Sequence, residues 1–340
     1  MRNWLRALFL APAWLYLGGL GGWFAASRLL GDRWWWLFLL DALALYLLAP
    51  LPLVTLVALA TRQRALLLGA GAGCALFLAL YGGLWLPRPP RAAPVGPALT
   101  VMTTNLLGFN SCPACVVATI RDSGADLVTL QELSPDVAAA IARDLADEYP
   151  YQLLDPQEQV FGMGAISRLP LRDTGETLPG TWVGRPQVLA LTFDDTRVLI
   201  VNAHPLATSP GDPAAMERTV RERYALAQTL VAFAQTHPGP LLYPGDSNTT
   251  DQNDAYRLLA TTWTDSWREA GRGFGHTYPG TDFSGQGRFR LGPVVIPRWL
   301  VRIDYVWHSA HWRAVAARVG PWDGGSDHRP VVARLILVTR

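Results

Sequence analysis

Lysine is missing from this chain of 340 residues, and the part from residue 98 onward has no excess of positive charge. Both absences narrow what the protein can be. All 29 basic residues are arginine, which we interpret as a coding bias rather than as chemistry. From residue 98 onward, 21 arginines face 25 acidic residues, so this part carries a net charge of −4. It therefore lacks the basic surface by which proteins grip long duplex DNA. That absence counts against nucleic acid as the substrate.

Cysteine is also scarce, with only three in the chain. Cys74 lies in an apolar stretch, whereas Cys112 and Cys115 form a C-P-A-C motif before a helix-like run. The motif is compatible with a short disulfide in an oxidising compartment or with two reduced thiols at a helix start. A redox role would need a thioredoxin-like context, and a zinc site would need more ligands nearby; neither is found.

Charged residues are rare in the first 86 positions, which consist of three apolar stretches over about residues 4–27, 34–60 and 65–86. Each stretch is long enough to cross about 30 Å of hydrocarbon as a helix. The first resembles a signal peptide, but its apolar run is too long and two more follow it. We therefore predict a multi-pass membrane region over residues 1–87, with the lipid bilayer as its partner. No protein partner is inferred.

A proline-rich segment over residues 88–97 separates this region from the rest of the chain and is expected to act as a stiff linker. The arginines on the two sides of the apolar stretches are balanced, so the positive-inside rule gives no clear orientation. With the N-terminus inside, three spans would place residues 98–340 outside the cytoplasm. We adopt that orientation as an expectation.

Residues 98–340 have the pattern of a mixed α/β domain. Strand-like runs over 98–104 and 196–202 and helix-like runs over 113–123 and 214–235 are interleaved along the chain. Several strand-like runs follow one another without a helix, which indicates substantial antiparallel pairing.

Six short polar clusters stand at the ends of these apolar runs or inside them. They supply carboxylates, carboxamides and imidazoles, the groups needed to hold a hard divalent cation and to hydrolyse a phosphate ester. In chain order they are T-T-N ending at Asn105, L-Q-E ending at Glu132, N-A-H ending at His204, G-D-S-N over Gly245–Asn248, I-D-Y around Asp304, and S-D-H-R-P over Ser326–Pro330.

Each polar residue has an ordinary structural interpretation beside the functional one. Glu132 is expected to be a principal ligand of the cation and Asn105 a neutral oxygen ligand; alone, they would be a surface acid and a turn residue. Asp246 and Asn248 stand two positions apart, so they point to the same side of an extended segment and could orient water and bind phosphoryl oxygens. Asp304 is the least ordinary, because an unpaired carboxylate inside an apolar strand is costly.

The ordered set of clusters resembles the endonuclease/exonuclease/phosphatase superfamily over about residues 98–340. The resemblance implies a four-layer α-β-β-α sandwich with its site at one end of the packed sheets. It places Asp327 near the metal and His328 near the scissile phosphate, with Asp304 hydrogen-bonded to His328. His204 would stabilise charge on the phosphate or assist the leaving group.

Two positions depart from the family pattern. Ser247 stands where the family usually has an aromatic residue, and Ala203 stands where a threonine usually precedes the histidine. We expect the first departure to affect the local packing of the loop rather than its chemistry. No acidic or tyrosine partner for His204 is evident in the sequence.

These patterns predict a membrane-anchored phosphoesterase that uses Mg²⁺ or Mn²⁺ and cleaves a phosphodiester or phosphomonoester by in-line attack of water. The phosphate-ester substrate would be a lipid headgroup, a small molecule or a nucleic acid. One alternative is a DNase-like nuclease acting outside the cytoplasm. Another is a non-catalytic membrane scaffold that retains the fold.

Overall fold

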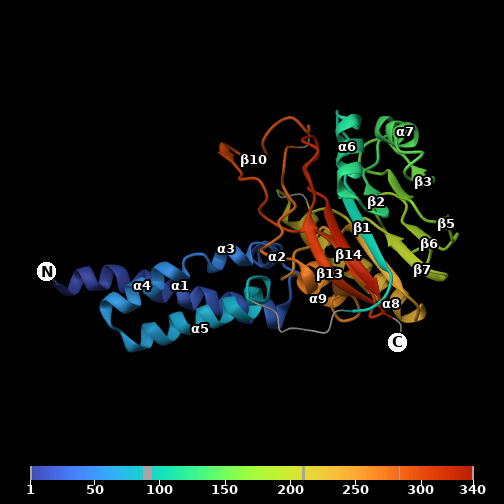
Figure 1. Ribbon diagram of the computed structural model, residues 1–340. Helices are drawn as coiled ribbons and strands as arrows, with labels where there is room; N and C mark the ends of the chain where they lie inside the picture. Colours follow the sequence, from blue (N-terminus) through green and yellow to red (C-terminus); the bar gives the residue numbers. More distant parts are fainter. Residues whose placement is uncertain (1, 87–93, 209–210, 283, 339–340) are drawn as a thin grey trace.

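The computed structural model describes residues 2–86, 94–208, 211–282 and 284–338, with side chains from residue 10 onward. A helical stalk, residues 2–86, extends from one side of an α/β domain that begins at residue 98 (Figure 1). Most of the predicted linker, residues 88–93, lies outside the described part.

The stalk holds more helices than the three apolar stretches predicted. The single helix expected over residues 34–60 is three helices in the structure, and the last break falls at Pro50, which caps α4. Proline lacks a backbone N–H and interrupts a helix that continues past it. The stalk helices are α1 (Arg2–Leu30), α2 (Trp35–Ala42), α3 (Ala44–Leu48), α4 (Leu51–Thr61), α5 (Arg64–Tyr81) and the short η1 (Gly82–Leu84).

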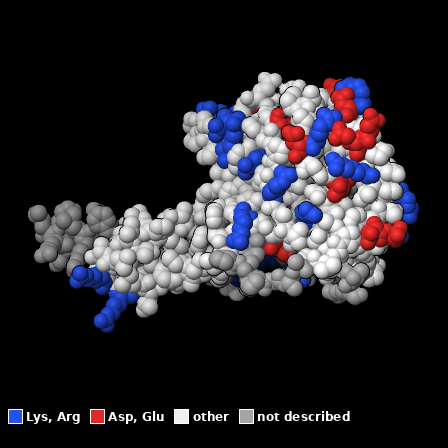
Figure 2. All heavy atoms as spheres, viewed as in Figure 1, with Lys and Arg blue, Asp and Glu red and all other residues white. Residues whose placement is uncertain are grey.

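Two stalk segments, Ala44–Thr61 and Arg64–Leu84, are long and apolar enough to cross a membrane by length and composition. Only 28% of each apolar window is buried inside the structure, so most of these side chains face outward. The predicted first span is part of α1, which contains Pro12 and is not among the segments that meet this criterion. Figure 2 shows few charged side chains on the visible face of the stalk, apart from basic ones toward its far end.

Glycines in α5 allow the stalk helices to pack closely. A Cβ atom at Gly69 would lie 2.8 Å from the Leu17 side chain, and one at Gly73 would lie 2.5 Å from the Leu51 side chain. Both distances are below normal van der Waals contact, so a larger residue at either position would require the leucine side chain to move. Gly71, in contrast, faces open space.

The domain is built on two mixed six-stranded sheets. In both, most neighbours are antiparallel, and a single parallel pair, β1–β2 or β7–β8, lies inside the sheet. The first sheet has the order β13 (Trp312–Val319), β14 (Val331–Leu337), β1 (Ala98–Asn105), β2 (Leu127–Gln131), β4 (Met163–Ser167), β3 (Tyr151–Asp155). The second has the order β5 (Leu171–Asp173), β6 (Gln187–Phe193), β7 (Thr196–Asn202), β8 (Leu241–Asp246), β12 (Asp304–His308), β9 (Thr264–Asp265).

Three apolar clusters show how the layers stack. One joins inward-facing residues of both sheets, such as Val101 and Ile200, and is the core between the sheets. A second packs the outer face of the first sheet against α6 (Pro113–Ser123) and α7 (Pro135–Asp144). A third packs the outer face of the second sheet against α8 (Pro213–Thr236) and α9 (Asp254–Leu259). The predicted four-layer α-β-β-α sandwich is confirmed.

The near end of the stalk is fixed to the domain by apolar and polar contacts. The Tyr46 hydroxyl donates to the carbonyl of Leu300 at 2.8 Å, and the Arg268 guanidinium donates to the carbonyl of Leu80 at 2.7 Å. Trp267, in α10 (Ser266–Ala270), is buried in the apolar cluster of the stalk. These contacts hold the domain in a defined position beside the helices.

Candidate active site

Six chain segments bring polar side chains to one edge of the two sheets. The parallel strands β1 and β2, and likewise β7 and β8, end at the same edge. Because β14 runs antiparallel to β1 and β12 antiparallel to β8, the starts of β14 and β12 lie there too. The register places Asp304 directly opposite Asp246. All eight residues predicted from the sequence lie at this edge.

Asn105 joins two of the carboxylates. Its amide nitrogen donates to Glu132 Oε1 at 2.9 Å and to Asp246 Oδ2 at 3.1 Å. The second oxygen of Glu132 accepts from the backbone N–H of Gly108 at 3.1 Å. Glu132 has a positive φ of 56°, which turns its side chain out of the end of β2 toward this cluster. Two carboxylates and one carboxamide are thus held within hydrogen-bonding distance across the two sheets.

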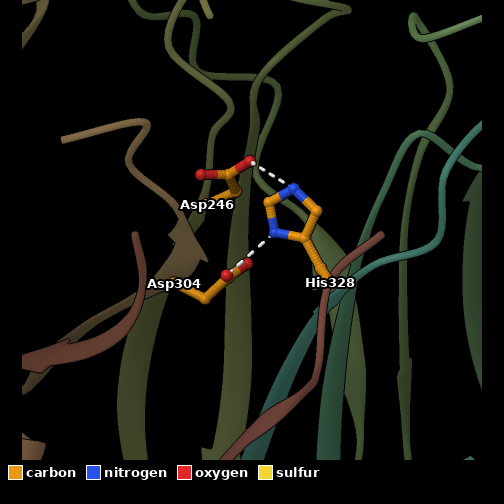
Figure 3. Close-up of side chains that lie close together, drawn as sticks. All are labelled: Asp246, Asp304 and His328. Carbon is orange, nitrogen blue, oxygen red and sulfur yellow. Dashed lines mark hydrogen bonds and ion pairs between the residues drawn. The ribbon is translucent and has the colours of Figure 1, made fainter. Parts of the chain in front are cut away.

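Asp304 and His328 form a buried pair (Figure 3). Asp304 is fully buried, and its Oδ2 atom lies 2.9 Å from Nδ1 of His328. This contact fixes the orientation of the imidazole and leaves Nε2 directed toward Asp246 Oδ2 at 3.8 Å. The hydrogen bond expected between Asp304 and His328 is confirmed.

His204 has partners that the sequence did not reveal. Its Nε2 atom lies 3.1 Å from Nδ2 of Asn248 and 3.4 Å from Oδ2 of Asp246. The backbone N–H of Asn248 donates to the other oxygen of Asp246 at 2.8 Å, and its side chain also donates to the carbonyl of Pro205 at 3.0 Å. The loop after β8 therefore folds back onto the segment after β7.

Crowded negative charge shapes the titration of this site. Burial raises the pKa of Asp327 to about 7; His328 opposes the rise, and Glu132 and Asp246 add to it. Burial lowers the pKa of His328, but the surrounding carboxylates, Asp304 first, raise it well above its usual value. Burial raises the pKa of Asp246, but the two imidazoles beside it bring it down to about 2. Such a concentration of carboxylates favours a bound cation.

The side chains fit a hard divalent cation. Asp246, Asp304 and His328 each offer a ligand atom, and these atoms lie within 4.8 Å of one another. The neighbouring oxygens of Glu132 and the side chain of Asn105 extend the same cluster. Carboxylate and carboxamide oxygens are the ligands that Mg²⁺ and Mn²⁺ prefer. Because Asp304 already accepts a hydrogen bond from His328, the oxygen-rich part nearer Glu132 is the better cation position.

Several supporting residues did not stand out in the sequence. The Tyr278 ring lies 4.9 Å from the His328 ring and forms one wall of the site. Gln131 donates to Asn202 at 2.8 Å beneath the site, linking the two sheets. Gln131 and Asn202 belong to the L-Q-E and N-A-H clusters. Their place at the ends of apolar runs was the signal that the sequence offered.

The two departures from the family pattern are both buried. Ser247 is 1% exposed and its hydroxyl lies 3.2 Å from the hydroxyl of Tyr243, which supplies an aromatic ring from within β8. Ala203 is fully buried, and its carbonyl lies close to Gly245. The position of Ser247 beneath the loop agrees with a packing role.

Comparison with known proteins identifies the family of this chain. The model of the Endonuclease/Exonuclease/phosphatase family matches residues 102–328, which is about two thirds of the chain. No curated protein matches the chain.

Solved structures share the fold at low sequence identity. Truncated Caenorhabditis elegans TDP2 has a TM-score of 0.55 and 15% identity, covering 70% of this chain and 98% of that one. D. rerio TDP2 complexed with a single-strand DNA product has a TM-score of 0.54 and 16% identity, covering 70% and 98%. An endonuclease/exonuclease/phosphatase family protein from Bacteroides thetaiotaomicron has a TM-score of 0.52 and 14% identity, covering 72% and 100%. The chain therefore belongs to the endonuclease/exonuclease/phosphatase family and is a hydrolase acting on phosphate esters.

Proposed function

We propose that this protein is a membrane-anchored phosphoesterase that uses Mg²⁺ or Mn²⁺ to cleave a phosphodiester or phosphomonoester by in-line attack of water. The observation that supports this most directly is the buried cluster in which His328 lies among Asp304, Asp246 and Asp327. Burying this set of charged side chains costs free energy unless a cation and an anionic substrate bind to it.

Each residue has a role that follows from its contacts. Glu132, Asp327 and Asn105 would hold the cation, which when bound polarises the phosphate and stabilises the leaving oxygen. Asp246, held by Asn105 and by the backbone of Asn248, orients the attacking water.

The remaining residues act on the phosphate. Nε2 of His204 lies beside both Asp246 and Nδ2 of Asn248, and these two nitrogens would bind the phosphoryl oxygens. His328 presents Nε2 to the phosphate, while Asp304 fixes its tautomer and raises its basicity.

Membrane anchoring is supported by the surface of the stalk. Large apolar side chains such as Leu15, Leu53 and Leu68 are 65–77% exposed, which is unfavourable in water and favourable in lipid. Trp34, Trp35 and Trp36 are also exposed where the stalk meets the domain, as in an interfacial aromatic belt.

The cysteine pair bears on the side of the membrane. The structure joins Cys112 and Cys115 in a disulfide at the start of α6. Disulfides persist mainly in oxidising compartments. This agrees with a domain outside the cytoplasm.

Hydrolysis of bis-p-nitrophenyl phosphate by the full chain in detergent tests the catalytic proposal. We expect turnover with Mg²⁺ or Mn²⁺, loss of turnover with a chelator, and no recovery in Glu132→Ala. Asp195→Asn, an exposed acid on the turn between β6 and β7, is the matched control and should remain active. A metal-loaded chain inert on this ester, on phosphomonoesters, on DNA and on phospholipid would refute the proposal.

The same preparation separates the alternatives. Nicking of supercoiled plasmid that is lost in Glu132→Ala would favour a nuclease. Calorimetry showing no binding of Mg²⁺ or Mn²⁺ would favour a non-catalytic scaffold.

A further inference from the structure

A small hairpin beside the site exposes apolar side chains. Strands β10 (Arg290–Leu291) and β11 (Val294–Val295) pair only with each other and form a two-stranded sheet of their own. Leu291 is 62% exposed, Val294 58% and Val295 42%. Gly292 and Pro293 connect the strands, so the three apolar side chains gather at the tip. In water this arrangement is unfavourable, and it indicates a surface that meets something apolar.

Arginines accompany the apolar tip. Arg288 and Arg290 are exposed and donate only to carbonyls of the hairpin itself, those of Ile296 and Pro293, both at 3.1 Å. Within the described part of the chain neither forms an ion pair with an acid. Figure 2 shows basic side chains gathered on the side of the domain where Figure 1 places β10, with most of the visible acidic ones farther from the stalk. An apolar tip with unpaired arginines matches the chemistry of an anionic lipid surface.

The hairpin lies where a bilayer surface would begin. The chain leaving it reaches Leu300, whose carbonyl accepts the hydrogen bond from Tyr46 at 2.8 Å. Tyr46 lies in the first turn of Ala44–Thr61, one of the two segments apolar enough to span a membrane. In Figure 1 the hairpin extends toward the side on which the stalk leaves the domain, reaching about the level of α3. A bilayer around the stalk would therefore meet the hairpin tip.

The stem of the hairpin borders the active site. The Phe289 ring lies 6.4 Å from the ring of Tyr278, which in turn lies 4.9 Å from the ring of His328. The backbone N–H of Leu300 donates to the carbonyl of Tyr278 at 2.8 Å. A lipid headgroup held at the hairpin would thus be next to the wall of the site.

We propose that the hairpin inserts Leu291, Val294 and Val295 into the boundary between headgroups and acyl chains of the bilayer that holds the stalk. Arg288 and Arg290 then lie among the lipid phosphates. The site takes its substrate from the same layer, so the substrate is the phosphate ester of a lipid headgroup. This rests on the proposed phosphoesterase function and names its substrate class.

Insertion is tested first, without reference to activity. The full chain carrying Cys74→Ala and Val294→Cys is labelled with an environment-sensitive fluorophore and reconstituted in vesicles of phosphatidylcholine and phosphatidylglycerol. We expect blue-shifted emission and quenching by lipids that carry a spin label near the headgroup. Thr192→Cys, an exposed position on β6 away from the stalk, is the matched control and should behave as in water. Water-like emission at position 294 overturns the proposal.

Activity on two substrates then tests the substrate class. The variant Leu291→Ser/Val294→Ser/Val295→Ser should hydrolyse bis-p-nitrophenyl phosphate at the wild-type rate. Its kcat/KM for releasing organic phosphate from vesicles of bacterial polar lipids should fall by about tenfold or more, because the tip no longer holds the site at the lipid surface. Arg288→Gln/Arg290→Gln should weaken the dependence of the lipid rate on phosphatidylglycerol content.

The outcomes separate this inference from the proposed function. A wild-type chain that cleaves the soluble ester but releases nothing from the vesicles overturns the lipid substrate and leaves the phosphoesterase standing. Equal loss on both substrates in the triple variant also contradicts a docking role. A chain inert on every ester defeats the proposed function, and the fluorescence result then decides the membrane contact of the hairpin alone.

Discussion

The buried carboxylate of Asp304 has no access to water and lies against the imidazole of His328. Asp304→Asn keeps the shape of the side chain but removes the charge that orients and polarises this imidazole. We expect kcat/KM for bis-p-nitrophenyl phosphate to fall about 10- to 100-fold, the usual effect of losing a hydrogen-bonding partner at a metal centre. A circular dichroism spectrum like that of the wild type would show that the fold is kept. Unchanged kcat/KM would mean that His328 does not depend on Asp304.

A second carboxylate, Glu269, lies far from the chemistry and is expected to contribute to stability against acid. Glu269 in α10 accepts from His308 Nε2 at 3.1 Å and from the backbone N–H of Ala314 at 2.7 Å. Burial raises the pKa of Glu269, but these hydrogen bonds, that of His308 first, bring it below its ordinary value of 4.5. A lowered folded-state pKa means that the stabilisation is present above the unfolded pKa and is lost as pH falls through the folded value.

Thermal unfolding across pH checks this prediction. Glu269→Gln should be less stable than the wild type by about 1–3 kcal/mol at neutral pH, the cost of weakening a largely buried acceptor. The difference in melting temperature between the two proteins should shrink as pH falls below 4.5. A difference that stays constant down to strong acid would show that the Glu269 carboxylate does not stabilise the fold through its charge.

At the scale of residues, the sequence patterns predicted one contact of the site and missed another. A lone carboxylate in the apolar run around Asp304 is costly without a partner, and the family resemblance implied that this partner is His328 of the S-D-H-R-P cluster. The partners of His204 were not predictable, because Asn248 reaches it only through the parallel pairing of β7 with β8. No motif along the chain encodes that neighbourhood.

At the scale of elements, the turn between α1 and α2 supports the loop that carries Asn248. The carboxylate of Asp32 accepts from the side chain of Asn253 at 2.9 Å and from the backbone N–H of Asp254 at 3.0 Å. The other end of the Asn253 amide accepts from both the backbone N–H and the hydroxyl of Thr250. A residue of the stalk thus anchors the segment two positions after Asn248.

Asp32→Ala should loosen this segment. Two buried donors lose their acceptor, which costs about 1–3 kcal/mol, and misplacement of Asn248 should lower kcat about tenfold with little change in KM. Hydrogen exchange of residues 248–254 should quicken in the variant. Asp32→Asn retains an acceptor oxygen and should recover most of the rate.

The neighbouring exposed Arg33 provides the control for this experiment, since Arg33→Ala changes the same turn without touching the domain loop. If Asp32→Ala and Arg33→Ala show the same hydrogen exchange and the same kcat, the stalk serves only as a tether. An effect seen only in Asp32→Ala would show that this turn positions the loop that carries Asn248.

Elements with a strong pattern were predicted accurately, and weakly patterned ones were missed. The helix over Pro113–Ser123 and the strand over Thr196–Asn202 match the structure at both ends. Strand Trp312–Val319 was not predicted because five of its eight residues are alanine or arginine, which do not alternate clearly between apolar and polar. The alanine-rich sequence over residues 135–149 also predicts a helix, but α7 ends at Asp144, where the chain turns toward β3.

At the scale of the whole molecule, the stalk and the sandwich form a single arrangement in which the site lies beside the near end of the helices. Tyr46 and Leu80 of the stalk contact Leu300 and Arg268 of the domain. The sequence separated the two parts through their composition, but it held no sign of these contacts. They depend on side chains more than 180 positions apart meeting in space.

The charges at the two ends of the stalk and the disulfide bear on which side of the membrane the domain occupies. The turn between α4 and α5 lies at the far end of the stalk, on the same side as the N-terminus (Figure 1), and carries Arg62 and Arg64. At the near end, Arg28 donates to Gln252 of the domain and Asp32 adds an opposing charge. Arg28 and Arg33 at the near end balance Arg62 and Arg64, so the positive-inside rule gives no orientation. The disulfide between Cys112 and Cys115 is what favours a domain outside the cytoplasm.

Cysteine labelling in intact cells measures this orientation. In a Cys74→Ala background, Thr192→Cys on the domain should react with a membrane-impermeant maleimide without permeabilisation. Gln63→Cys, exposed in the turn between α4 and α5, should react only after the membrane is opened. The disulfide between Cys112 and Cys115 should resist the reagent until it is reduced, as a bond formed outside the cytoplasm would. The reverse labelling pattern would place the domain in the cytoplasm and its lipid-facing hairpin on the inner leaflet.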